Sequence, residues 1–384
     1  MRLLSMVLGA ALASLALAGC GGGDETAAPS PAVPAGPTQL PLPSSAPTPV
    51  PTPAGTPTPV LSYWERHPAL AEAVGLYVLD ENGEQRRIVD FPAKTPRWSL
   101  DGERLYFVGA GWDYTRTHVY SVRPDGSDLQ NLLATGGEGY EFSPDLSIVA
   151  YHKLEQPEGW TVRVADLADP ASDRKLTDGF LESWSPDGRL IAYFYQVCEP
   201  PYAYWVTDLT GGQSKRVIVV TDNVLVSWFA WLPDGKRIAY RTLIRGEDGF
   251  ELGEVYAIDL ETLKWSYLPE LAFVPSRPLF SPDGQWFVYE GDGGLMLARW
   301  GEQGSKPIAS KGRTAVWGPG SDEIAILGEN QVIFYHLAGG QSQVVDLGPI
   351  EPSVGWLSLS ASWSPDGSQL ALTVSLAGGH GVCD

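Results

Sequence analysis

Aspartates recur at regular intervals along the 384-residue sequence and are the first candidates for chemistry. Six of them follow a proline or a leucine in similar local sequences: Asp101, Asp145, Asp187, Asp234, Asp283 and Asp366. A calcium site gathers six or more oxygen ligands in one place. A single aspartate in each widely spaced segment does not supply such a cluster, and a role in a tight turn accounts for each one. We therefore predict that these residues are structural and that the chain holds no metal.

Motifs of known catalytic chemistry are absent from the sequence. It has neither the Gly-x-Ser-x-Gly nucleophile turn nor the His-Glu-x-x-His zinc motif. The glycine-rich residues 291–294 lack the following lysine of a phosphate-binding loop. The five histidines are scattered: His67, His118, His152, His336 and His380. We therefore predict no catalytic residue and no cofactor.

The elements that must position any functional side chain are copies of one short motif. The clearest copy is Trp-Ser-Pro-Asp-Gly at residues 184–188. Seven copies are visible, and they begin at Trp98, Phe142, Trp184, Trp231, Phe280, Trp317 and Trp363. They are 37 to 49 residues apart, which is the length of one four-stranded propeller blade.

The chemistry of the motif predicts a strand, a corner and a second strand. Proline sets φ at the first corner position, aspartate caps backbone N–H groups, and glycine adopts a positive φ before the next strand begins. The aromatic residue ends the first strand and is expected to point between neighbouring blades. A short apolar strand follows each corner, as at residues 190–193.

The two ends of the repeat region are unmatched. Residues 75–89 resemble a third and fourth strand with no first pair, whereas residues 360–374 resemble a first pair with almost nothing after it. We predict an all-β, seven-bladed β-propeller of four-stranded blades, closed by pairing of these amino- and carboxyl-terminal strands. Such closure protects the sheet edges.

Candidate binding residues lie in loops that this topology places on the face opposite the Asp-Gly corners. Aromatic and charged side chains on loops held by a rigid frame are typical of binding sites. The candidates are Trp112, Tyr114, Arg116, His152, Trp160, Glu182, Tyr202, Arg277, Arg313 and Trp356. Each of these side chains could instead simply cover the ends of the core.

The motif copies, with the apolar strands after them, resemble the TolB-like propeller repeat. That repeat occurs in periplasmic TolB proteins and in the propeller domains of prolyl-oligopeptidase-type peptidases. The resemblance covers residues 76–373 and implies a propeller without a hydrolase domain. It also implies a protein that works by docking a partner, although propellers host many unrelated functions.

The first residues have the pattern of an export signal: a basic start, an apolar run, and small residues before Cys20. The sequence Leu-Ala-Gly-Cys at residues 17–20 resembles a bacterial lipobox, which implies cleavage before Cys20, acylation of its thiol and insertion into a lipid bilayer. We expect residues 1–19 to be a lipoprotein signal peptide, residues 20–60 a lipidated, Pro/Thr-rich disordered stalk, and residues 61–384 the propeller.

Charge and cysteine content limit the partners. The formal net charge of −20 argues against nucleic acid as a partner, because binding nucleic acid requires clustered basic residues.

Cys198 and Cys383 are expected to lie far apart around the ring, so we expect two free thiols, although export also permits a disulfide. We expect a monomer outside the cytoplasm, anchored to a bacterial membrane on its cell-surface or periplasmic side.

Two functions remain open on the sequence alone. The first is a non-catalytic module that binds a protein, a peptide or a glycan on the loop-rich face. The second is a hydrolase or lyase that acts on a sugar or lactone with carboxylates at the channel mouth. A flat, aromatic-rich mouth would favour the first function, and a pair of central carboxylates would favour the second.

Overall fold

The computed structural model describes residues 73–80, 82–110, 117–157, 159–195, 202–221, 223–246, 249–310, 314–328, 330–347 and 357–376. All of them belong to the unit that spans Leu61–Asp384. Several residues singled out above lie outside these ranges: the signal peptide, Cys20, the stalk, Trp112, Tyr114, Arg116, Cys198, Arg313, Trp356 and Cys383.

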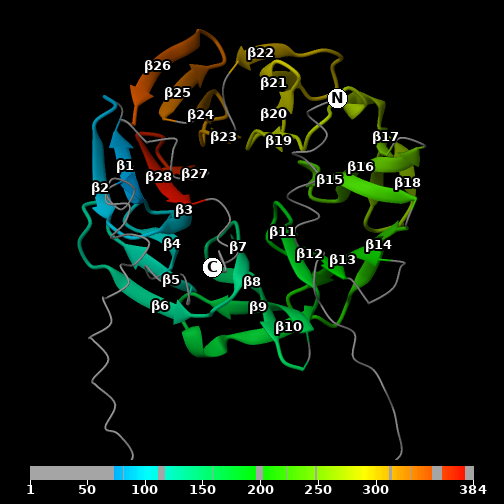
Figure 1. Cartoon of the computed structure of the whole chain (residues 1–384), viewed down its shortest axis with the longest axis horizontal. Helices are drawn as coiled ribbons and strands as arrows, with labels where there is room; N and C mark the ends of the chain where they lie inside the picture. Colours follow the sequence, from blue (N-terminus) through cyan, green and yellow to red (C-terminus); the bar gives the residue numbers. More distant parts are fainter. Residues whose placement is uncertain are drawn as a thin grey trace, which may run out of the picture. The chain divides into compact units, whose positions relative to one another are not determined.

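Seven four-stranded antiparallel sheets, here called blades 1–7, form a ring (Figure 1). Blade 1 contains β3 (Ala93–Trp98), β4 (Leu105–Ala110), β5 (Thr117–Val122) and β6 (Gln130–Ala134). Blade 2 contains β7 (Glu138–Phe142), β8 (Ile148–Glu155), β9 (Gly159–Asp166) and β10 (Arg174–Asp178). Blade 3 contains β11 (Phe180–Trp184), β12 (Leu190–Tyr195), β13 (Tyr202–Asp208) and β14 (Lys215–Val220).

The remaining blades repeat this order. Blade 4 contains β15 (Val224–Trp231), β16 (Arg237–Gly246), β17 (Gly249–Asp259) and β18 (Trp265–Tyr267). Blade 5 contains β19 (Leu279–Phe280), β20 (Trp286–Gly291), β21 (Gly294–Arg299) and β22 (Lys306–Ala309). Blade 6 contains β23 (Thr314–Trp317), β24 (Glu323–Leu327), β25 (Gln331–His336) and β26 (Gly340–Asp346). Two short 3-10 helices, η1 (Pro170–Ser172) and η2 (Pro269–Leu271), lie in connections.

Blade 7 is built from both ends of the repeat region, as predicted. Its strand order is β27 (Leu357–Trp363), β28 (Gln369–Leu376), β1 (Gly75–Asp80) and β2 (Gln85–Val89). The pairing of β1 with β28 runs without a break from Gly75 opposite Val374 to Asp80 opposite Gln369. The predicted seven-bladed propeller and its closure are therefore confirmed.

The corners have the predicted turn geometry. In the copy at residues 184–188, the Gly188 N–H donates to the Ser185 carbonyl oxygen at 2.9 Å, and Gly188 has a φ of 69°. The Ser185 hydroxyl donates to Asp187 Oδ1 at 2.6 Å. In two copies a residue other than glycine occupies this position and adopts a positive φ. They are Leu146, with a φ of 57°, and Ser321, with a φ of 64°. The sequence had predicted glycine as the residue that allows this backbone conformation.

The corner aspartates accept hydrogen bonds from their own turns. Hydrogen bonds from Ser364 and Ser368 hold the pKa of Asp366 down to about 2. Each of these carboxylates accepts hydrogen bonds within its own turn, which supports the structural role that the spacing predicted.

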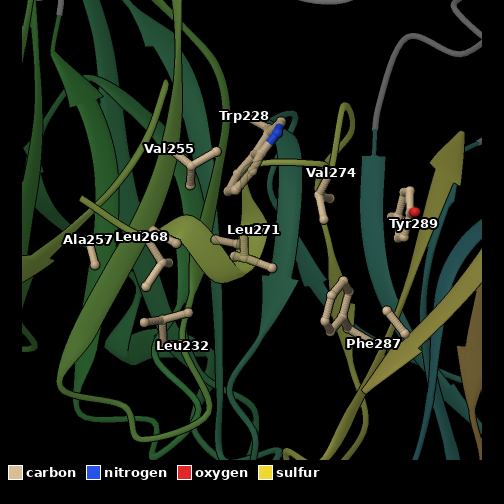
Figure 2. Close-up of a cluster of buried hydrophobic side chains, with 12 residues drawn as sticks. Trp228, Leu232, Val255, Ala257, Leu268, Leu271, Val274, Phe287 and Tyr289 are labelled. Atoms are coloured by element: carbon tan, nitrogen blue, oxygen red, sulfur yellow. The ribbon is translucent and has the colours of Figure 1, made fainter. Parts of the chain in front are cut away.

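Apolar clusters fill the spaces between neighbouring blades. Figure 2 shows the one between blades 4 and 5, where Trp228, Leu232 and Leu271 face Phe287 and Tyr289. Equivalent clusters join each of the other six neighbouring pairs, including blades 7 and 1. The core is thus a ring of interfaces, so each blade depends on both of its neighbours.

The motif aromatics also link the blades by hydrogen bonds, which the sequence did not predict. Five motif tryptophans donate their indole N–H to the innermost strand of the preceding blade, at 2.9–3.2 Å. The pairs are Trp98 with Ser362, Trp184 with Glu141, Trp231 with Ser183, Trp317 with Leu279, and Trp363 with Val316. Each tryptophan therefore both packs between blades and holds two inner strands together.

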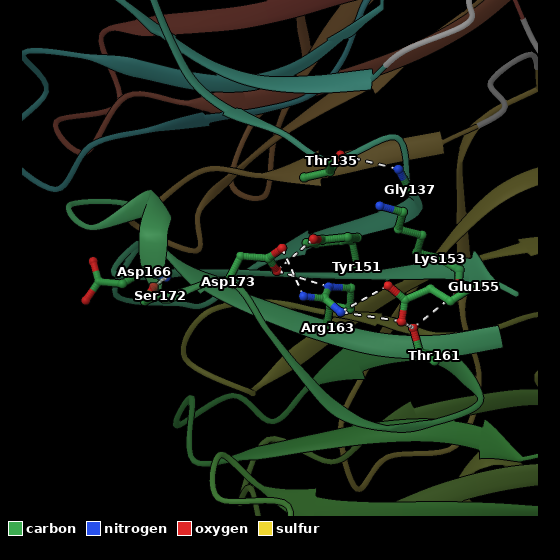
Figure 3. A network of polar contacts seen from close by, with 10 residues as sticks. All are labelled: Thr135, Gly137, Tyr151, Lys153, Glu155, Thr161, Arg163, Asp166, Ser172 and Asp173. Atoms are coloured by element: carbon green, nitrogen blue, oxygen red, sulfur yellow. Dashed lines mark hydrogen bonds and ion pairs between the residues drawn. The ribbon is translucent and has the colours of Figure 1, made fainter. Parts of the chain in front are cut away.

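A network of charges braces blade 2 (Figure 3). Arg163 donates through Nε and Nη2 to the two oxygens of Asp173, and through Nη1 to Glu155 Oε1 at 3.1 Å. The Tyr151 hydroxyl donates to Asp173 and the Thr161 hydroxyl to Glu155. These groups satisfy one another between the strands and the loop, so they hold the blade together.

Among the described residues, no helix has the length and apolar character needed to cross a bilayer.

The closure of the ring can be tested at Val78, which is 3% exposed in β1 between blades 7 and 1. We expect Val78→Asp to lower the free energy of unfolding by about 3–5 kcal/mol, because it places an unpaired charge in that interface. Gln85→Asp, on the exposed part of β2, adds the same charge and is expected to change little. Urea unfolding of the two variants measures the difference. Equal midpoints would mean that β1 is not part of the ring.

Candidate functional site

The innermost strands of the blades surround a cavity of about 670 Å³. In five blades the residue directly before the motif aromatic lines this cavity: Arg97, Glu141, Ser183, Ala230 and Leu279. The aromatic itself packs between blades, so its neighbour in the strand faces the centre, as the alternation of side chains in a strand requires. At one end the cavity is lined by corner residues, including Leu100, Pro144 and Pro186. It therefore reaches the face opposite the one on which the sequence placed the binding residues.

Charged side chains meet in this largely apolar surrounding. Arg97 comes from β3, Glu141 from β7, and Arg277 from the segment just before β19, and all three line the cavity. Glu182 lies close by on β11, at a bulge in its pairing with β12. Arg277 is exposed, whereas Arg97, Glu141 and Glu182 are half-buried.

Both carboxyl groups are shifted toward the protonated form. Burial raises the pKa of Glu182 to about 7, although Arg277 acts in the opposite direction. Burial also raises the pKa of Glu141, against the effects of Arg97 and Arg277. Because Arg277 acts on both carboxyl groups, these side chains form one electrostatic unit. A carboxyl group that titrates near neutral pH in a cavity is typical of functional sites.

Further charged residues lie at the start of β3 and β7, the strands that carry Arg97 and Glu141. Lys94 begins the charged part of β3 and Glu138 begins β7. Burial lowers the pKa of Lys94, and Glu138 opposes this effect. β3 thus carries two cations and β7 two carboxylates, in each case three residues apart across an irregularity in the pairing.

The predicted binding residues do not all meet in one place. Arg277 lines the central cavity, and Glu182 lies on β11 within the electrostatic influence of Arg277. His152 and Trp160 instead pack with Phe180, with ring centroids 5.0–5.5 Å apart, between blades 2 and 3. Burial lowers the pKa of His152 to about 4. Tyr202 contacts Phe194 within blade 3, at 6.2 Å between ring centroids.

Sequence reasoning missed Arg97 and Glu141. A usable signal was present, because both occupy the position directly before the motif aromatic, and that position lines the cavity in other blades as well. Within the part of the chain that the structure describes, no group of three or more His, Cys, Asp or Glu side chains could hold a metal ion.

Comparisons with known proteins support the fold. No family model matches the sequence. The uncharacterized protein Atu1656 of Agrobacterium fabrum is 24% identical over 257 residues, which cover 61% of this chain and 83% of that protein. Dipeptidyl-peptidase 5 of Porphyromonas gingivalis is 24% identical over 231 residues, 56% of this chain. The match spans 33% of the length of that peptidase, so the activity of the whole enzyme does not transfer to this chain.

Solved structures with a likeness to this chain include an oligogalacturonate lyase and a TolB protein. An oligogalacturonate lyase in complex with manganese has a TM-score of 0.52 at 14% sequence identity, covering 78% of this chain and 82% of the lyase. TolB from Acinetobacter baumannii has a TM-score of 0.40 at 16% identity, covering 82% of this chain and 67% of that one. At such identities the likeness shows the propeller fold alone. The fold and cavity define a seven-bladed propeller with a charged central pocket.

The raised pKa of Glu182 is expected to affect how the free energy of unfolding depends on pH. A carboxyl group with a raised pKa in the folded state stabilises the fold below its unfolded pKa, and this contribution is lost as the pH rises through the folded value. We expect wild type to lose about 3 kcal/mol relative to Glu182→Gln between pH 4.5 and pH 7.5. Urea unfolding of both proteins across this range measures the difference. A constant difference would show that Glu182 titrates as an ordinary exposed carboxyl group.

Proposed function

We propose that this chain is a membrane-anchored extracytoplasmic propeller lipoprotein that binds the end of a protein, peptide or glycan in its central cavity without catalysing a reaction. The observation that carries the proposal is the cavity itself, where at least five blades contribute apolar and charged side chains to one opening. Concave sites that combine an apolar lining with a few charged groups are typical of ligand binding. The proposed anchor rests on the lipobox-like residues 17–20.

A second candidate function is an enzyme that acts on a sugar or lactone. The specific observation in its favour is the pair Glu141 and Glu182, whose carboxyl groups both have raised pKa values. A carboxyl group with a pKa near 7 could serve as a general acid or base at neutral pH. Arg277 beside both groups would stabilise negative charge on a reacting oxygen. The propeller fold of an oligogalacturonate lyase is compatible with such chemistry.

Filling the cavity tests the binding function. Leu279 is 41% exposed and lines the cavity, whereas Leu129 is 46% exposed and lies outside the cavity lining. We expect Leu279→Trp in the full-length protein to abolish capture of the ligand from an extract of the producing cells, and Leu129→Trp to capture as well as wild type. Quantitative mass spectrometry of the captured material measures the ratio.

Two outcomes would contradict this function. Equal capture by the three proteins would mean that the ligand does not enter the cavity. A captured glycan that wild type cleaves, and that Glu182→Gln binds intact, would establish the enzyme.

The anchor is tested separately. We expect Cys20→Ser to move the protein from the membrane fraction to the soluble fraction, because acyl chains on this thiol would provide the attachment. Fractionation of cells that express each form, with fatty-acid labelling, measures the shift. If the Cys20→Ser variant still incorporates the labelled fatty acid and stays in the membrane fraction, the lipid is attached at another residue.

A further inference from the structure

The two arginines of the central cavity differ in their surroundings from the arginines that pair with carboxylates. Arg104, Arg163, Arg237 and Arg299 each pair with a carboxylate. No carboxylate oxygen of a described residue lies within 4.0 Å of a side-chain nitrogen of Arg97 or Arg277. Arg97 donates instead to the backbone oxygen of its neighbour Pro96, at 3.0 Å.

We propose that Arg97 and Arg277 bind a carboxylate group of a ligand in the central cavity, and that the neighbouring acidic side chains Glu141 and Glu182 take up protons when it binds. The proposal rests on the proposed binding function and specifies the chemistry of its ligand. Guanidinium groups are suited to this role, because their planar N–H groups match the two oxygens of a carboxylate.

The electrostatics of the cavity favour an anion in spite of the acidic character of the whole chain. Glu141 on β7 faces Arg97 of β3 and Arg277, whereas Glu182 on β11 faces Arg277 and Tyr204 of β13. Lys94 and Glu138 form a further oppositely charged couple on β3 and β7. Because burial favours the protonated form of Glu141 and Glu182, these carboxyl groups neutralise the two arginines less than ordinary carboxylates would.

The proton coupling follows from the same arrangement. A bound anion disfavours ionisation of the carboxyl groups beside it and so raises their pKa values further. Binding therefore takes up protons, and by linkage the affinity increases as the pH falls from 8 to 6. A cavity without these two carboxyl groups would lack this dependence.

The apolar part of the lining restricts the rest of the ligand. Leu100 and Leu279 are exposed residues of the cavity wall, and Phe142 and Phe280 contribute aromatic surface. Such a wall suits a carboxylate attached to an apolar body or to the face of a sugar ring. A peptide carboxyl terminus and a sugar acid share this chemistry, so both belong in the test.

The experiment is calorimetric titration of the full-length protein in detergent at pH 6 and pH 8. The probes are N-acetyl-leucine with its neutral amide, and galacturonate with neutral galactose. We expect at least one acid to bind, with its neutral counterpart at least tenfold weaker. The acid that binds identifies the source of the carboxylate. Titration in buffers of different ionisation enthalpy should show proton uptake.

Variants separate the cavity from the rest of the surface. We expect Arg277→Gln and Arg97→Gln each to weaken acid binding at least tenfold, whereas Arg299→Gln, in an exposed ion pair with Glu302, leaves it unchanged. Glu182→Gln should still bind the acid but with a smaller change in affinity between pH 6 and pH 8. Thermal unfolding shows whether each variant is folded. If Arg97→Gln does not fold, the binding measured with Arg277→Gln, which changes an exposed residue, tests the proposal.

Three results would overturn the proposal: neither acid binds, a neutral counterpart binds as well as its acid, or Arg277→Gln binds like wild type. In each case the binding function still stands if capture depends on Leu279. Conversely, acid binding without any ligand captured through the cavity would leave a small-molecule site and remove the macromolecular partner.

Discussion

The pairing of β1 with β28 is the constraint on which the rest of the structure depends. It joins the two ends of the repeat region in one sheet and leaves no unpaired edge inside blade 7. It also brings blade 7 against blade 1, where the Trp98 indole donates to the Ser362 carbonyl oxygen at 3.0 Å and the Thr95 N–H donates to the Ser360 hydroxyl at 3.1 Å. Only a closed ring directs all seven innermost strands toward one centre. The cavity and its charges therefore depend on the pairing of the two ends of the repeat region.

One short motif supplies both the frame and the lining of the site. Its aromatic residue fills the space between blades and, when it is tryptophan, bonds to the strand of the preceding blade. The residue just before the aromatic lines the cavity in five blades, although Ala230 also belongs to the apolar cluster between blades 4 and 5 and the Ser183 hydroxyl accepts from Trp231. That position carries Arg97, Glu141, Ser183, Ala230 and Leu279 in different blades. The charge of the cavity lining can thus vary from blade to blade while the motif aromatics stay in place.

The fold could be predicted from the sequence because turn chemistry is local. Pro-Asp-Gly corners and their spacing indicate blades without knowledge of any distant contact, and the unmatched strands at residues 75–89 and 360–374 indicate how the ring closes. The site was predicted only in part. Glu182 and Arg277 were predicted as loop residues between blades, yet Glu182 lies on the inner strand β11 and Arg277 lines the cavity, and Arg97 and Glu141 were not predicted. The reason is physical, because a shared cavity depends on which side of each inner strand faces the centre, and bulges shift that alternation from blade to blade.

The central claim is that the cavity around Arg277 is where this protein meets its ligand. The most direct measurement is the rate at which phenylglyoxal modifies Arg277 in the full-length protein, followed by mass spectrometry, with and without an extract of the producing cells. Arg299, on β21 of the same blade, serves as the internal reference. The account predicts that the extract slows modification of Arg277 and leaves that of Arg299 unchanged. Equal rates at Arg277 with and without the extract would contradict it.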